Sequence, residues 1–128
     1  MKHRIAKPAA ALLALLSAPL FAHHGTNASY DLAKQVTMTG TVTEFVWQNP
    51  HCQIYFDVKD EHGNIVHWAG ETNSPGVLSR DGWSRKIMRP GDSITITVSP
   101  SKANTPVGVV RKIVLPDGRV LTRLNAID

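Results

Sequence analysis

The chain has little cysteine, because Cys52 is the only one among its 128 residues. A single thiol excludes an internal disulfide, although small exported domains often rely on such bridges. The fold must therefore be held by side-chain packing and strand pairing alone. Cys52 alternates with Ile54 and Phe56 along the chain, so we expect it to point into the core in a structural role, as a small apolar side chain.

The sequence also lacks an apolar run long enough to span a bilayer, which takes roughly 20 residues. The first hydrophobic stretch, residues 9–16, is interrupted by Ser17 and Pro19. It follows three basic residues, Lys2, Arg4 and Lys7. This arrangement is typical of a secretory signal peptide. We predict that residues 1–22 are removed by cleavage after Ala22, and that the mature protein is exported to the bacterial periplasm with no membrane span left.

The predicted mature chain lacks a strong excess of either charge. The full sequence has 14 basic and 10 acidic residues, but three of the basic residues lie in the predicted signal peptide. The remaining 11 basic and 10 acidic residues leave a net charge of +1. Such a balance gives no support to a nucleic-acid partner or to an anionic membrane surface as a partner.

Apolar and polar residues alternate with a period of two through most of the mature chain, which is typical of half-buried strands. We expect strands near residues 36–47, 52–58, 66–71, 94–98 and 107–115, followed by a short ribbon over 119–124. In the first strand the apolar phase slips by one residue between Val42 and Phe45, which predicts a β-bulge and a bend. Ser74, Pro75 and Gly82 predict a helix of about two turns between the third and fourth strands.

This order of elements is that of the OB-fold, a small five-stranded Greek-key barrel. A β-sandwich is the alternative, but it usually has about seven strands and no helix. We therefore expect an all-β, OB-like barrel over residues 35–128, with one short helix between strands 3 and 4. The polar segment 23–34 is expected to form an extended N-terminal arm.

Four motifs follow one another along the chain: AHHG, TGTVTEFVWQNPHCQIYFDVKDEHGNIVHWAGET, NSPGVLSRDGWS and RPGDSITITV. Together they resemble a family of small exported bacterial proteins of unknown function, with a signal peptide, a His-His pair and a W-x-N-P-H strand end. The resemblance implies a periplasmic OB-like barrel and implies no activity. The chain departs from the family pattern at Gly25, where serine is more frequent, and at Cys52, where an ordinary apolar residue is usual. A functional role is therefore better supported for His51 than for Cys52.

The predicted cleavage leaves His23 as the first residue, followed by His24. A free α-amino group and an imidazole on one residue can chelate Cu(II), an ion that nitrogen-rich sites favour. His51 is a candidate for a further ligand. The alternatives are that the two N-terminal histidines belong to a flexible polar arm, and that His51 is structural and bonded to Glu71 or Gln53 across the sheet.

The three tryptophans have different expected roles. Trp47 precedes Asn49 at the end of the first strand and is a candidate for an exposed stacking residue. Trp47, Asn49 and Glu71 form a hypothetical ligand surface, since OB-folds bind oligosaccharides through such aromatic residues. Trp68 is expected in the core, and Trp83 is expected to close the barrel next to the helix, so both are structural.

His67 shares a strand face with Glu71, which makes Glu71 a candidate supporting carboxylate if His67 is a metal ligand. A solvated contact is the alternative for this pair.

The sequence contains no nucleophile elbow, phosphate loop or metalloprotease helix, and we therefore do not expect an enzyme. The first hypothesis is a periplasmic binding module that holds copper or another divalent metal at His23, His24 and His51. The second is a structural or interaction barrel, without metal, that binds an envelope protein or a glycan. OB-type oligonucleotide binding is a third hypothesis, and the charge balance argues against it.

Overall fold

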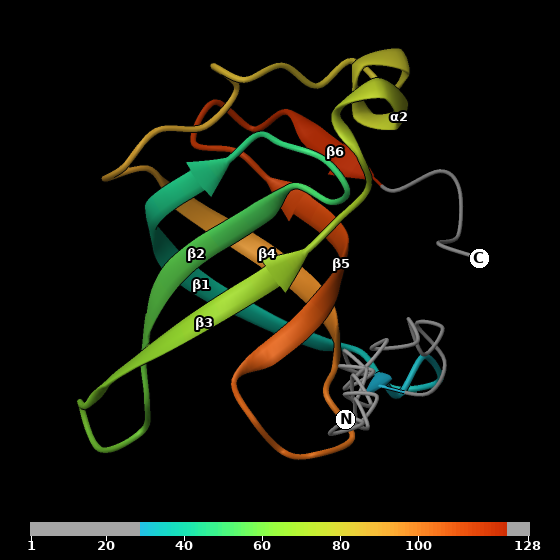
Figure 1. Ribbon diagram of the computed structural model, residues 1–128. Helices are drawn as coiled ribbons and strands as arrows, with labels where there is room; N and C mark the ends of the chain where they lie inside the picture. Colours follow the sequence, from blue (N-terminus) through green and yellow to red (C-terminus); the bar gives the residue numbers. More distant parts are fainter. Residues whose placement is uncertain (1–28, 123–128) are drawn as a thin grey trace, which may run out of the picture.

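The computed structural model describes residues 29–122, so the predicted signal peptide, its cleavage site, His23 and His24 lie outside the described residues. Figure 1 shows the arrangement of the strands and of the helix α2. The elements are β1 (Val36–Val46), β2 (Gln53–Lys59), β3 (Ile65–Glu71), α2 (Pro75–Arg80), β4 (Ser93–Pro100), β5 (Val107–Val114) and β6 (Val120–Thr122). Within residues 29–122, no helix has the length and apolar character needed to cross a membrane.

The strands form a closed barrel of OB type. β1 pairs antiparallel with β2 on one side and with β4 on the other; β2 continues to β3, and β4 continues to β5. A parallel pairing of β3 with β5 closes the barrel. The predicted OB-like barrel, with a short helix between strands 3 and 4, is confirmed. β6 pairs with β5 as an additional strand, within the short ribbon that the sequence predicted.

β1 takes part in both sides of the barrel. Its residues 36–41 pair with β4, and its residues 41–46 pair with β2. The register with β2 shifts between Val42 and Glu44, at the place where the phase slip in the sequence predicted a bulge. Because a bulge bends its strand, β1 can pass from one side of a small barrel to the other.

The helix α2 lies at one end of the barrel (Figure 1). Ser74 precedes it in an extended conformation, and Pro75 begins it, where the missing N–H breaks no helical hydrogen bond. The helix ends in a Schellman motif, in which the N–H groups of Gly82 and Trp83 donate to carbonyls of the last turn. Gly82 supplies the left-handed residue that this ending needs, with φ of 84°. Leu78 and Trp83 are buried and join the core.

One apolar core fills the barrel. Fully buried side chains reach it from β1, β2, β4, β5, α2 and the residue before β2. They include Val42, Cys52, Ile54, Phe56, Leu78, Ile94, Ile96, Val98, Val110 and Ile113. Cys52, Ile54 and Phe56, whose alternation in the sequence predicted a core-facing side of the second strand, are buried as expected, and Val58 is half-buried.

The pairing of β3 with β5 depends on two glycines. Gly70 and Gly108 face each other in the register. A Cβ on Gly108 would lie 2.7 Å from the Val98 side chain, and a Cβ on Gly70 would lie 2.9 Å from the Val110 side chain. A side chain at either position would press on a core valine, so the glycines let the two strands lie close over the filled core.

We predict that Gly108→Ala lowers the free energy of unfolding by about 1–3 kcal/mol, the range for overpacking a filled core. Gly76→Ala in α2 is the matched control, because a Cβ there meets no atom within 4 Å. The control should be neutral or slightly stabilising. Urea denaturation followed by tryptophan fluorescence measures both variants. Equal midpoints for Gly108→Ala and the unmodified protein would contradict this explanation of the β3–β5 pairing.

Candidate functional site

Tyr30, His51 and Glu71 meet at one place, although they are far apart in the sequence. Glu71 ends β3, His51 lies between β1 and β2, and Tyr30 belongs to the segment before β1. Nδ1 of His51 lies 2.6 Å from Oε1 of Glu71, and the Tyr30 hydroxyl donates a hydrogen bond to Oε2 of Glu71 at 2.7 Å. One carboxylate therefore holds both a phenol and an imidazole.

Backbone pairing holds Glu71 in place from two sides. Glu71 lies opposite Gln53 of β2 and opposite Val109 of β5. Its side chain is 21% exposed, and that of His51 is 33% exposed. The contact with Glu71 uses Nδ1 of His51. With the proton on Nδ1, the lone pair is on Nε2, and Nε2 is the ring nitrogen left to meet a ligand.

The described part of the predicted arm, residues 29–34, is docked on the barrel. Tyr30 forms an isolated β-bridge with Ser101. The Arg111 guanidinium on β5 donates to the Leu32 carbonyl at 3.3 Å. The segment contains a turn and lies against β5 and the loop after β4, where the sequence predicted an extended arm.

The environment of Tyr30 favours its protonated form. Burial raises the pKa of Tyr30 well above its usual value, and the hydrogen bond to Glu71 and the negative charge of Glu71 raise it further. The phenol therefore remains a hydrogen-bond donor throughout the physiological pH range. Sequence reasoning did not identify Tyr30 as a site residue. Its one signal was an isolated aromatic residue in a polar segment, and its partner is 41 positions away.

The described residues supply only part of a possible metal site. Within residues 29–122, no group of three or more His, Cys, Asp or Glu side chains could hold a metal ion. His51 and Glu71 nevertheless fit a metal ligand and its supporting carboxylate, because metal-bound histidines commonly donate their other ring N–H to a carboxylate. His23 and His24, the other predicted ligands, lie outside the described residues.

The hypothetical ligand surface is less open than the sequence suggested. Trp47 is half-buried and packs edge to face against Phe45, with ring centroids 5.8 Å apart. Asn49 is exposed. Glu71 already has two partners. Trp47 therefore contributes to packing as well as to the surface, and it presents only part of its ring to a ligand.

The residues assigned to structural roles are packed against the core. Trp83 is 3% exposed and Cys52 is fully buried. Trp68 is half-buried and stacks on Phe56, with ring planes 20° apart. Burial raises the pKa of the Cys52 thiol above its usual value. A protonated thiol is a poor nucleophile and a poor metal ligand.

A second histidine–carboxylate pair lies on the outer face of the barrel. His67 of β3 is opposite Asp57 of β2, and Nδ1 of His67 lies 2.5 Å from Oδ1 of Asp57. The sequence suggested Glu71 as the carboxylate for His67, but the structure supplies the cross-strand partner, which lies directly opposite. The His67 side chain is 81% exposed, so this pair is a solvated contact.

The sequence pattern of one family, described as a family of unknown function (DUF6152), matches residues 10–110. The chain belongs to this family. The range matched to DUF6152 begins within the predicted signal peptide, ends in β5 and includes Tyr30, His51 and Glu71. Neither a curated protein nor a solved structure matches the chain. Membership of DUF6152 assigns no activity, so the function must be argued from the site.

We predict that Tyr30→Phe destabilises this DUF6152 protein by about 1–2 kcal/mol, because the partly buried Glu71 carboxylate loses a hydrogen-bond donor. Tyr55→Phe is the matched control, since Tyr55 is another tyrosine, 39% exposed on β2. Urea unfolding curves of the two variants provide the comparison. If both variants unfold at the same urea concentration, the Tyr30 hydroxyl does not have the role given to it here.

Proposed function

We propose that this protein is an exported, non-catalytic binding module of the bacterial periplasm that binds a divalent metal ion, with Cu(II) preferred. His51 is one ligand, and the histidines at the mature N-terminus, His23 and His24, supply the others. One observation carries the proposal: Nδ1 of His51 is held 2.6 Å from the Glu71 carboxylate, which orients the imidazole and leaves Nε2 for a ligand.

The surroundings of His51 are those of a metal-ligating histidine. Contact with a carboxylate fixes the tautomer and the orientation of the ring and raises the basicity of the other nitrogen. The Tyr30 hydroxyl occupies the second oxygen of Glu71, which restrains the carboxylate from turning to another partner. An imidazole that is already ordered loses little conformational freedom when it binds a metal.

The docked segment before β1 supports a contribution from the N-terminus. Tyr30 contacts the same carboxylate as His51, so the chain already lies beside the site six residues after His24. A fully extended chain covers at most ~3.3–3.6 Å per residue, which gives six residues a reach of roughly 20 Å. His23 and His24 are therefore close enough along the chain to meet Nε2 of His51.

The chemistry of the predicted mature terminus favours copper. Cleavage after Ala22 gives His23 a free α-amino group beside its own imidazole. Together with His24 and His51, these nitrogens form a set that suits Cu(II), which also binds most tightly among the divalent first-row ions. The ligands must be deprotonated to bind, so protons and copper compete for the same nitrogens.

The test uses protein exported and processed by its own signal sequence, so that the N-terminus is native. Intact mass identifies the cleavage site, and a Cu(II) titration followed by electron paramagnetic resonance reports the stoichiometry and the donor atoms. We predict one equivalent of Cu(II), bound tighter than about micromolar, roughly −8 kcal/mol, with a nitrogen-rich spectrum. His51→Gln should weaken binding about tenfold or more. His23→Ala, or one extra residue before His23, should remove the terminal chelate.

His67→Gln is the matched control, because His67 also contacts a carboxylate through Nδ1 but does so with Asp57. Its copper affinity should equal that of the unmodified protein. Equal losses in His51→Gln and His67→Gln would contradict the assignment of His51 as a ligand. Cu(II) binding no tighter than about micromolar would contradict the proposed metal function. It would favour a structural or interaction barrel that binds an envelope protein or a glycan.

A further inference from the structure

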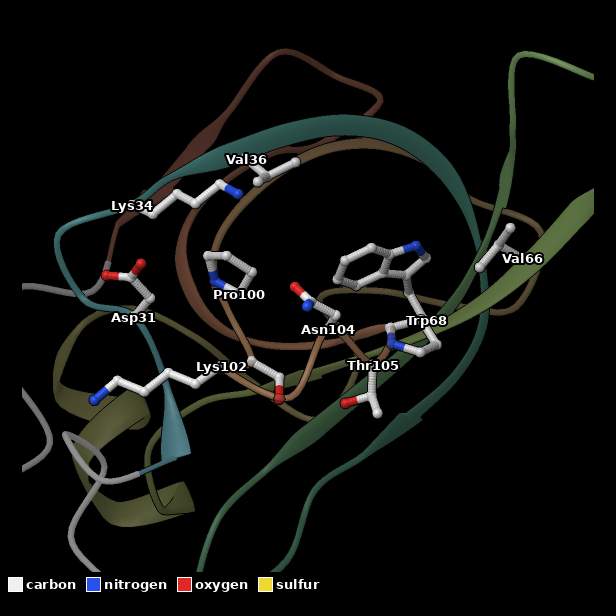
Figure 2. A pocket seen from close by; sticks show the side chains of 11 residues that line it. Asp31, Lys34, Val36, Val66, Trp68, Pro100, Lys102, Asn104 and Thr105 are labelled. Carbon is white, nitrogen blue, oxygen red and sulfur yellow. The ribbon is translucent and has the colours of Figure 1, made fainter.

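Figure 2 shows a cavity of about 520 Å³. The loop between β4 and β5, which forms part of its wall, lies at the end of the barrel away from α2 (Figure 1). Its walls come from the docked segment before β1, from the starts of β1 and β3, and from the end of β4 with the loop that follows. Its lining includes Lys34, Val66, Trp68, Pro100, Lys102 and Asn104. Its volume falls within the range of roughly 300–1,000 Å³ that is usual for small-molecule sites.

The Trp68 ring is the main apolar surface of this cavity. It stacks on Phe56 of β2 with ring planes 20° apart, so the protein holds the ring in position. Val66 and Pro100 also line the cavity (Figure 2). A half-exposed aromatic ring that is held in a concave site offers a surface on which a flat apolar group can stack.

Two polar groups are directed toward the same space. Figure 2 shows the Asn104 side chain between Pro100 and the Trp68 ring, and the Lys34 amine turned inward beside Val36. Lys102 also lines the cavity, but Figure 2 shows its amine pointing away from the opening. The cavity therefore combines the Lys34 amine and the Asn104 amide with an aromatic ring, and Asp31 adds one negative charge to its lining.

Asn104 and Asp31, which both line the cavity, are held in local turns. Asn104 has φ of 57°, in the left-handed region that asparagine adopts more readily than most residues. Residues in such conformations cluster at binding sites. Asp31, an acidic residue that lines the cavity, is engaged in a local turn, where its Oδ1 accepts from the Ala33 N–H at 3.3 Å.

We propose that this cavity binds a small organic anion with a flat apolar body and one carboxylate or sulfonate group. The apolar body stacks on Trp68. The acidic group pairs with the Lys34 amine and accepts a hydrogen bond from the Asn104 amide, because charge-assisted hydrogen bonds of this kind are the strong ones. The site goes beyond the metal function, and neither site needs the other to be occupied.

The test uses two fluorescent probes that differ in charge. Anilinonaphthalene sulfonate has the proposed shape and an acidic group, and phenylnaphthylamine is a neutral counterpart. Each is titrated into the mature protein, and nitrogen-edited proton NMR locates the bound sulfonate. We predict one bound sulfonate probe per protein and a shift of the Trp68 indole N–H signal. Lys34→Gln should lower the affinity for the sulfonate probe by roughly five- to tenfold and leave the affinity for the neutral probe unchanged.

Lys102→Gln is the matched control, because it removes the same charge from an amine that points away from the opening. It should leave the affinity for both probes unchanged. Trp68→Phe should lower the affinity for both probes, because a smaller ring offers less area for stacking. The proposal is overturned if Lys34→Gln and Lys102→Gln weaken the sulfonate probe equally, since net charge alone would then explain the binding. It is also overturned if neither probe binds, or if the NMR shifts lie on another surface.

Discussion

The barrel closes through a short parallel pairing in which three residues of β3 meet three residues of β5. Gly70 and Gly108 permit this contact, because a Cβ at either position would overlap a core valine. The next residue of β3 is Glu71, which lies between Gln53 of β2 and Val109 of β5. The closure of the barrel therefore also determines where the Glu71 carboxylate lies, and the candidate site is built on that carboxylate.

The segment before β1, residues 29–34, contributes to both the Glu71 site and the cavity at the end of the barrel. It contributes Tyr30 to the Glu71 carboxylate and accepts a hydrogen bond from Arg111 of β5 at the Leu32 carbonyl. The same segment contributes Lys34 to the cavity at the opening of the barrel. Residues 29–34 are thus an integral part of the domain, and they lie between two candidate binding sites of different chemistry.

Local patterns in the sequence predicted much of the barrel. The phase slip after Val42 marked the bulge in β1, and Ser74 and Gly82 marked the two ends of α2, because these features depend on neighbouring residues. The barrel closure followed from the order of the elements. No local pattern identified the two glycines that permit the β3–β5 pairing, since their role depends on how close the strands come to the core.

The candidate site was predictable only in part. The sequence offered Glu71 and Gln53 as partners of His51, and the structure selects Glu71. Tyr30 could not be assigned, because its partner is 41 positions away and the contact arises only when the segment docks on the finished barrel. His67 was placed with Glu71 on the basis of a shared strand face, but the strand register puts Asp57 directly opposite.

We propose that Nε2 of His51 is a metal ligand and that the Glu71 carboxylate sets the orientation of its ring. The direct test is anomalous diffraction at the copper edge, from crystals of the natively processed protein with one equivalent of Cu(II). We expect one copper peak within coordination distance of Nε2, with Nδ1 still in contact with the Glu71 carboxylate. A copper peak at other histidines with His51 unbound, or a His51 ring turned away from Glu71, would contradict it.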